Sequence, residues 1–204
     1  MRVELDPEQV ASREIYATLN SVVVPRPIAW VSTRSAEGVL NLAPHSFFTV
    51  SCVRPPMVQF TSVGRKDSLN NVEATGEFVV NFAAEALFEQ VNASGTNFPP
   101  EVSEFEAIGV TTEPSRTVGV PRVAESPVAI ECTLHTTLEL GDCTIVIGQV
   151  RAIAIDESVL ADGRPEVRLL RPLARLGKDE WSTLGEVHEI SRIPYADWPG
   201  HFSA

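Results

Sequence analysis

The chain has 204 residues, of which 44% are hydrophobic and 21% are charged, a composition typical of a globular protein with room for one substantial core. Sixteen Lys and Arg residues against 27 Asp and Glu residues give a net charge of −11, the wrong sign for a protein that neutralises nucleic-acid phosphates. No stretch approaches the roughly 18 apolar residues of a membrane-spanning helix, and no basic region with a following apolar run opens the chain. We therefore expect neither a nucleic-acid nor a membrane partner.

The three cysteines, Cys52, Cys132 and Cys143, are odd in number and show no CxxC spacing. This pattern argues against a disulfide framework and against a structural zinc site. We expect buried free thiols and a reducing, cytoplasmic location. The four histidines are too scattered along the chain to predict a metal site.

Residues 22–63 alternate short β-branched runs with proline and glycine, a pattern typical of strands separated by tight turns. The runs at residues 22–25, 28–33 and 57–61 are predicted strands, and residues 35–38 are a predicted hairpin loop.

A short helix is predicted over residues 67–75, because the capping-type Asp67 opens the segment and Gly76 can end it. A strand is expected at residues 78–82. The spacing of apolar residues over 83–93 predicts a second short helix.

The strongest periodic signal covers residues 128–140, where apolar and polar residues alternate as in a half-buried strand. Gly141 and Asp142 supply turn chemistry, and residues 143–155 form the predicted return strand of a long antiparallel hairpin. Long strands need closure or cover to hide their edges. The predicted fold is therefore mainly β with a few short helices, closed into a barrel.

We expect one domain over residues 1–204 with two peripheral segments. Residues 95–127 lack a clear period and are rich in Pro, Gly, Ser and Glu, so they are predicted to be a surface excursion. Residues 171–204 carry aromatic residues among prolines and glycines, so they are predicted to cover the barrel or a partner subunit.

The turn at residues 62–68 is a candidate phosphate site. Gly64 permits a tight turn, and Arg65 and Lys66 follow it just before the predicted helix. Helix-start N–H groups, cations and serine hydroxyls together suit a terminal phosphate. The same residues also fit a solvated turn in which Asp67 caps the helix, and capping is the role expected of Asp67 because its charge is unfavourable beside a phosphate.

Residues 41–48, with the sequence NLAPHSFF, are a second candidate. Ala43 and Pro44 would let a flat ligand approach the backbone, and Ser46 could satisfy its polar edge. A strand-end bulge without any ligand would use the same residues.

A third segment, residues 25–33, ends in Ser32 and Thr33, the candidate ligand contacts there. Core packing explains its Ile28 and Trp30 better than a ligand does. The chain lacks GxxxxGKS, GxGxxG, HExxH and GxSxG motifs, and no acid–base dyad stands out. No catalytic residue is predicted.

Taken together and in order, several segments resemble the flavin reductase-like family. The segments are residues 25–33, 41–48, 66–71, 75–81, 171–177 and 184–187, so that the resemblance covers about residues 15–190. The resemblance implies an FMN-binding split β-barrel, Greek-key-like, in a homodimer with FMN near the subunit interface.

By position, the resemblance also implies a set of cofactor-binding residues. They are Ser32, Thr33, Asn41, Ala43, Pro44, His45, Ser46, Ser62, Arg65, Lys66 and Ser68. The last four would hold the phosphate, and the others would approach the ring and the ribityl chain. His45 stands where an aromatic residue is expected, and Trp181 replaces a common Tyr; His45 would either tune the flavin or simply pack beside its ring.

The resemblance favours a flavin oxidoreductase that transfers hydride from NADH or NADPH to flavin N5, with the cofactor performing the chemistry. The alternative is an FMN-holding electron-transfer protein that serves a partner without its own NAD(P)H turnover. A flavin-using oxygenase or another redox protein is the expected partner.

Overall fold

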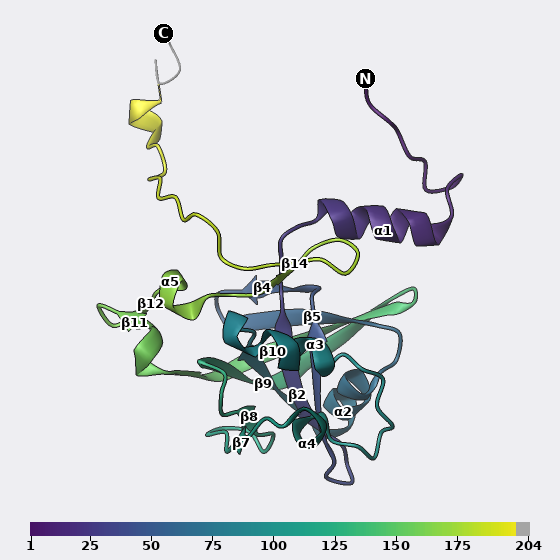
Figure 1. Ribbon diagram of the computed structural model, residues 1–204, viewed down its shortest axis with the longest axis vertical. Helices are drawn as coiled ribbons and strands as arrows, with labels where there is room; N and C mark the ends of the chain where they lie inside the picture. Colours follow the sequence, from purple (N-terminus) through teal and green to yellow (C-terminus); the bar gives the residue numbers. More distant parts are fainter. Residues whose placement is uncertain (199–204) are drawn as a thin grey trace.

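A seven-stranded antiparallel sheet forms the body of the computed structural model, which describes residues 1–198 (Figure 1). In sheet order, its strands are β3 (Leu40–His45), β2 (Ala29–Arg34), β6 (Glu77–Phe82), β9 (Val128–Leu140), β10 (Cys143–Ile155), β5 (Met57–Val63) and β4 (Phe48–Cys52). The order is not sequential, in agreement with the Greek-key-like connections expected. The β9–β10 hairpin is confirmed, and Gly141 takes the left-handed conformation in its turn, with φ of 60°.

The sheet closes on itself at the connection between its two edge strands. Strands β3 and β4 lie at opposite edges of the sheet, yet only Ser46 and Phe47 separate them in the chain. The Thr61 N–H in β5 donates to the Phe47 carbonyl at 2.9 Å, which extends the β4–β5 pairing into this connection. The edges are thus joined by a tight connection and not by a full ladder, which gives a barrel with an opening along one seam.

Short helices surround the barrel. They are α1 (Ser12–Val22), α2 (Asp67–Thr75), α3 (Phe88–Ala93), α4 (Glu104–Ile108) and α5 (Val167–Leu170), with 3₁₀ turns η1 (Glu85–Leu87), η2 (Glu157–Val159) and η3 (Tyr195–Asp197). Helix α2 has the predicted bounds, and Gly76 ends it in the left-handed conformation with φ of 74°. The predicted helix at residues 83–93 is confirmed in its second half, whereas its first turn is 3₁₀.

Three small sheets complete the structure. They are β1 (Arg26–Pro27) with β13 (Ala174–Arg175) and β14 (Trp181–Ser182), β7 (Thr112–Glu113) with β8 (Arg122–Val123), and β11 (Leu160–Ala161) with β12 (Arg164–Pro165). The first of these sheets ties the C-terminal part of the chain to the segment that leads into the barrel.

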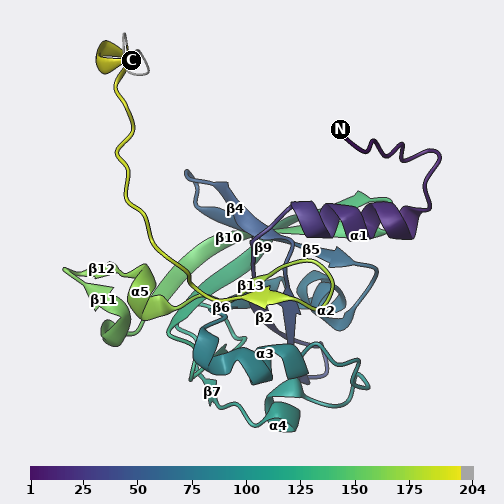
Figure 2. The same cartoon turned by 45° about the horizontal axis from the view of Figure 1, so that its top comes forward.

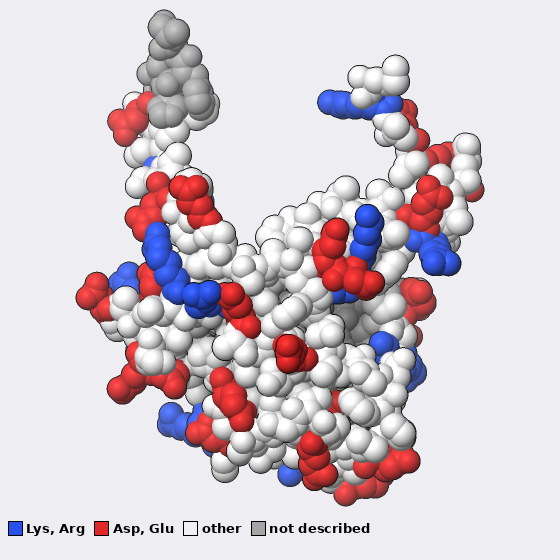
Figure 3. Space-filling view, in the orientation of Figure 1, with Lys and Arg blue, Asp and Glu red and all other residues white. Residues whose placement is uncertain are grey.

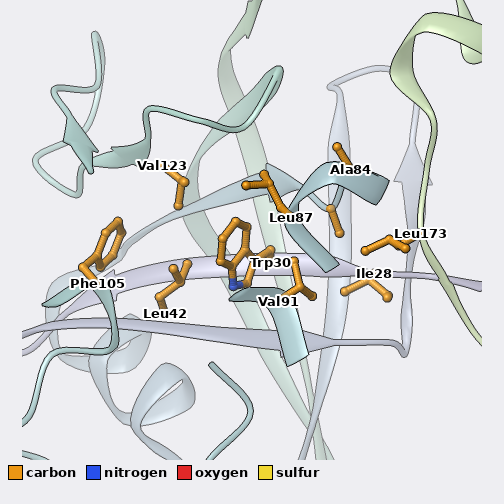
Figure 4. Packing of buried hydrophobic residues seen from close by; sticks show 10 residues of the cluster. Ile28, Trp30, Leu42, Ala84, Leu87, Val91, Phe105, Val123 and Leu173 are labelled. Carbon is orange, nitrogen blue, oxygen red and sulfur yellow. The ribbon is translucent and has the colours of Figure 1, made fainter. Parts of the chain in front are cut away.

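Strand β2 separates two hydrophobic clusters, because its successive side chains point to opposite faces. Trp30 packs with Leu42 and Phe105 outside the barrel, as Figure 4 shows, and its indole N–H donates to Ser94 Oγ at 2.8 Å. The other face contributes to the barrel interior, where the Phe60 and Phe78 rings meet edge to face at 5.4 Å. The barrel is therefore a packed core.

The predicted strand at residues 22–25 is wrong. Helix α1 runs to Val22, and the Val23 N–H donates to the Leu19 carbonyl at 2.9 Å to end it. The sheet ladders of the described residues include no partner for this run, and Val22, Val23 and Val24 are all exposed. β-Branched composition alone cannot make a strand where no neighbouring strand supplies hydrogen bonds.

Residues 95–127, expected to be mostly a surface excursion, also contribute to the core. Phe105 belongs to the cluster around Trp30, and Val118 and Val120 pack against Val79. Glu131, one of the polar residues in the alternating pattern of β9, is fully buried, and the backbone N–H groups of Arg116 and Thr117 in this segment donate to its carboxylate. Packing against the sheet thus gives residues 95–127 a defined structure, although their sequence shows no helix or strand periodicity.

The two ends of the described chain project from the same side of the body (Figures 1 and 2). Residues 174–182 pack in the small sheet, but residues 183–198 extend away from the barrel and do not cover it. Coverage of a partner subunit, the other expectation for this segment, stays a prediction. Phe202, one of the aromatic residues of the predicted covering segment, lies outside the described residues. All three cysteines are free thiols; Cys132 is buried, as expected, whereas Cys52 and Cys143 are half-buried.

Candidate functional site

A cavity of about 530 Å³ opens where the β3–β4 corner, the start of α2 and the loop after α3 meet. The surface is hollowed below α1 in the space-filling view (Figure 3), and Tyr16 of α1 contributes to the cavity wall. Eight of the predicted residues line this cavity: Asn41, Ala43, Pro44, His45, Ser46, Arg65, Lys66 and Ser68. The fold therefore brings together residues 41–48 and residues 62–68, neither of which indicates a ligand site specifically when taken alone.

The start of α2 presents donors to the cavity. Lys66 is the N-cap residue with an extended backbone, and no side chain caps the helix. This corrects the capping role expected of Asp67, which stands in the first turn instead. A first-turn carboxylate still interacts favourably with the helix dipole. The helix-start N–H groups consequently remain available for an anion.

Arg65 also lines the cavity, but its guanidinium is engaged elsewhere. Its Nε donates to Asn70 Oδ1 at 3.2 Å, and its Nη2 forms an ion pair with Glu73. More than half of the Arg65 side chain is exposed. Because an exposed ion pair contributes little free energy, a bound anion could draw Arg65 toward the cavity at small cost.

Hydrogen bonds fix the polar floor of the cavity. Asn41 Nδ2 donates to Ser68 Oγ at 3.1 Å and to Thr33 Oγ1 at 3.3 Å. Asn71 Nδ2 donates to the same Thr33 hydroxyl at 3.0 Å. These hydrogen bonds fix helix α2 relative to strand β3, so that Ser68 has a defined position.

His45 is buried at the end of β3. Its Nε2 lies 3.2 Å from Ser68 Oγ, and its ring packs on Phe60 with centroids 4.6 Å apart. The pKa of His45 is lowered to about 4, mainly by burial and also by the nearby Lys66 charge, against a hydrogen bond with the Thr61 backbone that raises it. The imidazole is therefore neutral at pH 7 and can orient the Ser68 hydroxyl.

Three predicted residues lie away from the cavity wall, which corrects the expectation that they approach a ligand. Ser32 is fully buried and donates to the Pro121 carbonyl at 2.8 Å, because its side chain faces the β8 side of the sheet. Thr33 is fully buried under Asn41 and Asn71. Ser62 turns back to donate to the Gly64 carbonyl at 2.8 Å, so it shapes the turn.

Part of the cavity wall consists of residues that were not predicted from the sequence. The additional lining residues include Tyr16, Thr61, Gly95, Thr96, Asn97, Phe98 and Glu104. Most of them belong to the loop after α3, in the segment predicted to be a surface excursion. The small polar run at residues 94–97 was the available signal, but only the fold brings it opposite the β3–β4 corner.

Glu104 is a buried carboxylate at the edge of this cavity. Its Oε2 accepts the Leu42 N–H at 2.9 Å. Burial raises its pKa, the backbone hydrogen bonds oppose that shift, and the negative charge of Asp67 adds to it. The residue anchors α4 to β3 and places negative potential beside the cationic turn.

No helix within the described residues is long and apolar enough to cross a membrane. Nor do residues 1–198 contain a group of three or more His, Cys, Asp or Glu side chains arranged for a metal ion.

Residues 21–173 match the flavin reductase like domain family. A solved structure of nitrilotriacetate monooxygenase component B from Bacillus cereus is 32% identical, with a TM-score of 0.89 over 93% of this chain and 99% of that one. The 2-nitrobenzoate 2-nitroreductase of Pseudomonas fluorescens is 28% identical, with a TM-score of 0.88 over 95% and 98%. A split-barrel protein of Shewanella frigidimarina, 22% identical with a TM-score of 0.81 over 95% and 100%, shows the same fold. These likenesses confirm the predicted split barrel.

Proposed function

Because the chain belongs to the flavin reductase-like family, we propose that it binds FMN in the 530 Å³ cavity and acts as a flavin oxidoreductase reduced by NADH or NADPH. The observation that carries the proposal is the meeting, in one cavity, of the Lys66–Ser68 helix start with the Ala43–Ser46 corner. The cavity lies within the range of roughly 300–1,000 Å³ typical of small-molecule sites.

The donor set fits the phosphate of FMN. Lys66 and Arg65 supply positive charge, α2 supplies free N–H groups, and Ser68 supplies a hydroxyl. In a chain of net charge −11, such a concentration of donors and cations favours an anionic group. Ala43 and Pro44, half-buried on the opposite wall, leave room for a flat ring against the backbone.

Bound FMN would supply two-electron redox chemistry, with a reduced nicotinamide as the hydride source. The chain's own contribution is to bind and orient. Lys66 and the α2 N–H groups hold the phosphate end, and Ser68 turns its one hydroxyl proton from the neutral His45 to the phosphate when FMN binds. No side chain is required to accept or donate a proton in the hydride transfer itself.

We further propose that two copies assemble into a homodimer through the side from which α1 and residues 183–198 project (Figure 1). Leu19, Val22 and Val23 leave exposed apolar side chains on this side, as do Ile190 and Tyr195. Apolar arms that protrude from a body are typical of surfaces that become buried in an assembly. A second copy would then cover the cavity mouth near Tyr16.

The likeness to component B of a two-component monooxygenase, at 32% identity, supports a role in supplying reduced flavin to an oxygenase partner. The three free thiols support a reducing, cytoplasmic location.

Steady-state oxidation of NADH and NADPH by the purified protein with added FMN tests the proposed activity. We expect turnover that depends on FMN. Bound FMN that is reduced only by another protein, without NAD(P)H turnover, would instead establish the electron-carrier alternative.

A further inference from the structure

We propose that a second pocket beside the flavin cavity binds the anionic group of the second substrate, with Arg175 as the residue that binds it. This inference rests on the proposed function, because it names the class of molecule that exchanges electrons with the flavin. The pocket has a volume of about 240 Å³. It shares Pro44, Ser46 and Gly95 with the flavin cavity, so one molecule can extend from one into the other.

Two arginines lie opposite each other in the small sheet, and one of them, Arg175, lines this pocket. Arg26 in β1 and Arg175 in β13 are directly opposite partners in an antiparallel pair. Like charges in that position destabilise a sheet. Burial lowers the pKa of Arg26, and the Arg175 charge lowers it further. The chain has a net charge of −11, yet these two arginines are paired in one sheet. An anion bound beside them would be stabilised by their positive charge.

The arginine pair has little counter-charge of its own. Arg26 is buried and donates mainly to backbone carbonyls, those of Asn20, Val23 and Leu176, which are dipoles and not charges. The described ion pairs of Arg175 comprise one carboxylate, that of the fully exposed Asp179, at 3.5 Å. Solvent screening leaves such a contact weak. A substrate oxyanion can therefore replace it.

Arg175 is both oriented and accessible. Its guanidinium lies 4.9 Å from the centre of the Trp181 indole, and Trp181 in turn packs edge to face on Phe88 at 5.2 Å. Nη2 donates to the Lys178 carbonyl at 2.8 Å. Among the contacts of the described residues, Nε and Nη1 of Arg175 have no hydrogen-bond partner, and a quarter of the side chain is exposed. Donors thus remain for a substrate oxyanion.

The two pockets together define a substrate class. One end of the molecule is a planar redox-active ring in the shared space by Pro44 and Gly95, and the other end is an oxyanion at Arg175. The diphosphate of a nicotinamide dinucleotide and the carboxylate of an aromatic acid both supply this chemistry. Trp181 and Ile28 give the pocket the apolar wall that either planar molecule would contact.

The test compares Arg175→Gln with Arg171→Gln. Arg171 precedes it by four residues, is well exposed, pairs with Glu85 and does not line this pocket. FMN-loaded protein is reduced anaerobically by NADH, by NADPH and by 1-benzyl-1,4-dihydronicotinamide, which has no anionic group. We expect Arg175→Gln to raise the half-saturating dinucleotide concentration about tenfold, the effect of losing a charge-assisted hydrogen bond. The uncharged donor should be unaffected, and so should Arg171→Gln.

Calorimetric titration with inorganic diphosphate and with benzoate needs no turnover and separates the two sources. Tighter diphosphate binding identifies a dinucleotide, and tighter benzoate binding identifies an aromatic acid. Either must be lost in Arg175→Gln and only partly regained in Arg175→Lys, which keeps the charge but not the planar guanidinium. Absence of binding by both probes in the unaltered protein, or equal loss with Arg171→Gln, overturns the inference. FMN affinity and thermal midpoint, measured on every variant, show whether folding or the flavin site has failed instead.

Discussion

His45 Nε2 lies 3.2 Å from Ser68 Oγ, which joins the end of β3 to the start of α2 at the cavity floor. Ser68 Oγ also accepts a hydrogen bond from Asn41. A neutral imidazole can accept a hydrogen bond from the serine hydroxyl, whereas an imidazolium cannot. The hydroxyl's orientation therefore depends on the protonation state of a buried histidine.

Stability should fall as the pH is lowered through this histidine's titration. The pKa of His45 is about 4 in the folded chain, against 6.5 for the free group. The unfolded chain thus binds the proton first, and stability is lost as pH falls from about 6.5 to about 4, by roughly 3 kcal/mol in total. His45→Gln should remove this part of the slope. Urea unfolding of both proteins from pH 7.5 to pH 4 measures the difference; parallel curves would contradict it.

Replacing Arg65 and Lys66 by Ala should weaken FMN binding much more than riboflavin binding, because only FMN carries the phosphate. We expect a loss of about tenfold or more for FMN. The matched control replaces Arg164 and Arg168 by Ala, which removes the same charge away from the cavity. Fluorescence titration with both ligands gives the comparison, and equal losses for both would exclude the phosphate site.

Glu73→Gln should tighten FMN binding. This change removes the ion-pair partner of Arg65 and leaves the guanidinium free to turn toward the phosphate. The gain should be a few-fold, since exposed ion pairs contribute up to about 1 kcal/mol. Glu89→Gln, on the exposed side of α3, serves as the control for net charge. Unchanged affinity in Glu73→Gln would mean that Arg65 does not reach the ligand.

The homodimer is tested on α1. Leu19→Glu combined with Val22→Glu places two charges in the proposed interface, where both side chains are exposed in the single chain. Burying unpaired carboxylates is costly, so light scattering should give the mass of a monomer. Val102→Glu with Leu169→Glu, also at exposed positions but away from α1, should leave the dimer intact. A monomeric unaltered protein with full FMN affinity would contradict the interfacial site.

Gly148→Ala should destabilise the barrel. A methyl group at this position would lie 2.2 Å from Phe78 Cζ and 3.1 Å from Cys132 Cβ. Overpacking of this kind costs about 1–3 kcal/mol. Gly185→Ala, where nothing lies within 4 Å, is the control. Thermal unfolding of the two variants distinguishes them, and similar midpoints would show that Phe78 can move aside.

The sequence by itself determined the elements whose signals are local. Alternation over Val128–Leu140 predicted one of the two longest strands with its bounds, and Asp67 and Gly76 bracketed α2 correctly. The cavity segments around Ala43 and Lys66 were also identified, because small residues, cations and a helix start carry their chemistry wherever they meet.

Tertiary structure decided what depends on distant partners. Residues 22–25 look like a strand but have no strand to pair with, and Ser32 looks like a ligand contact but faces the wrong side of the sheet. Arg175 had no local motif, and its pairing with Arg26 across 149 positions places it beside the cavity. Side-chain direction and long-range contacts follow from how the barrel closes, and no local pattern records that closure.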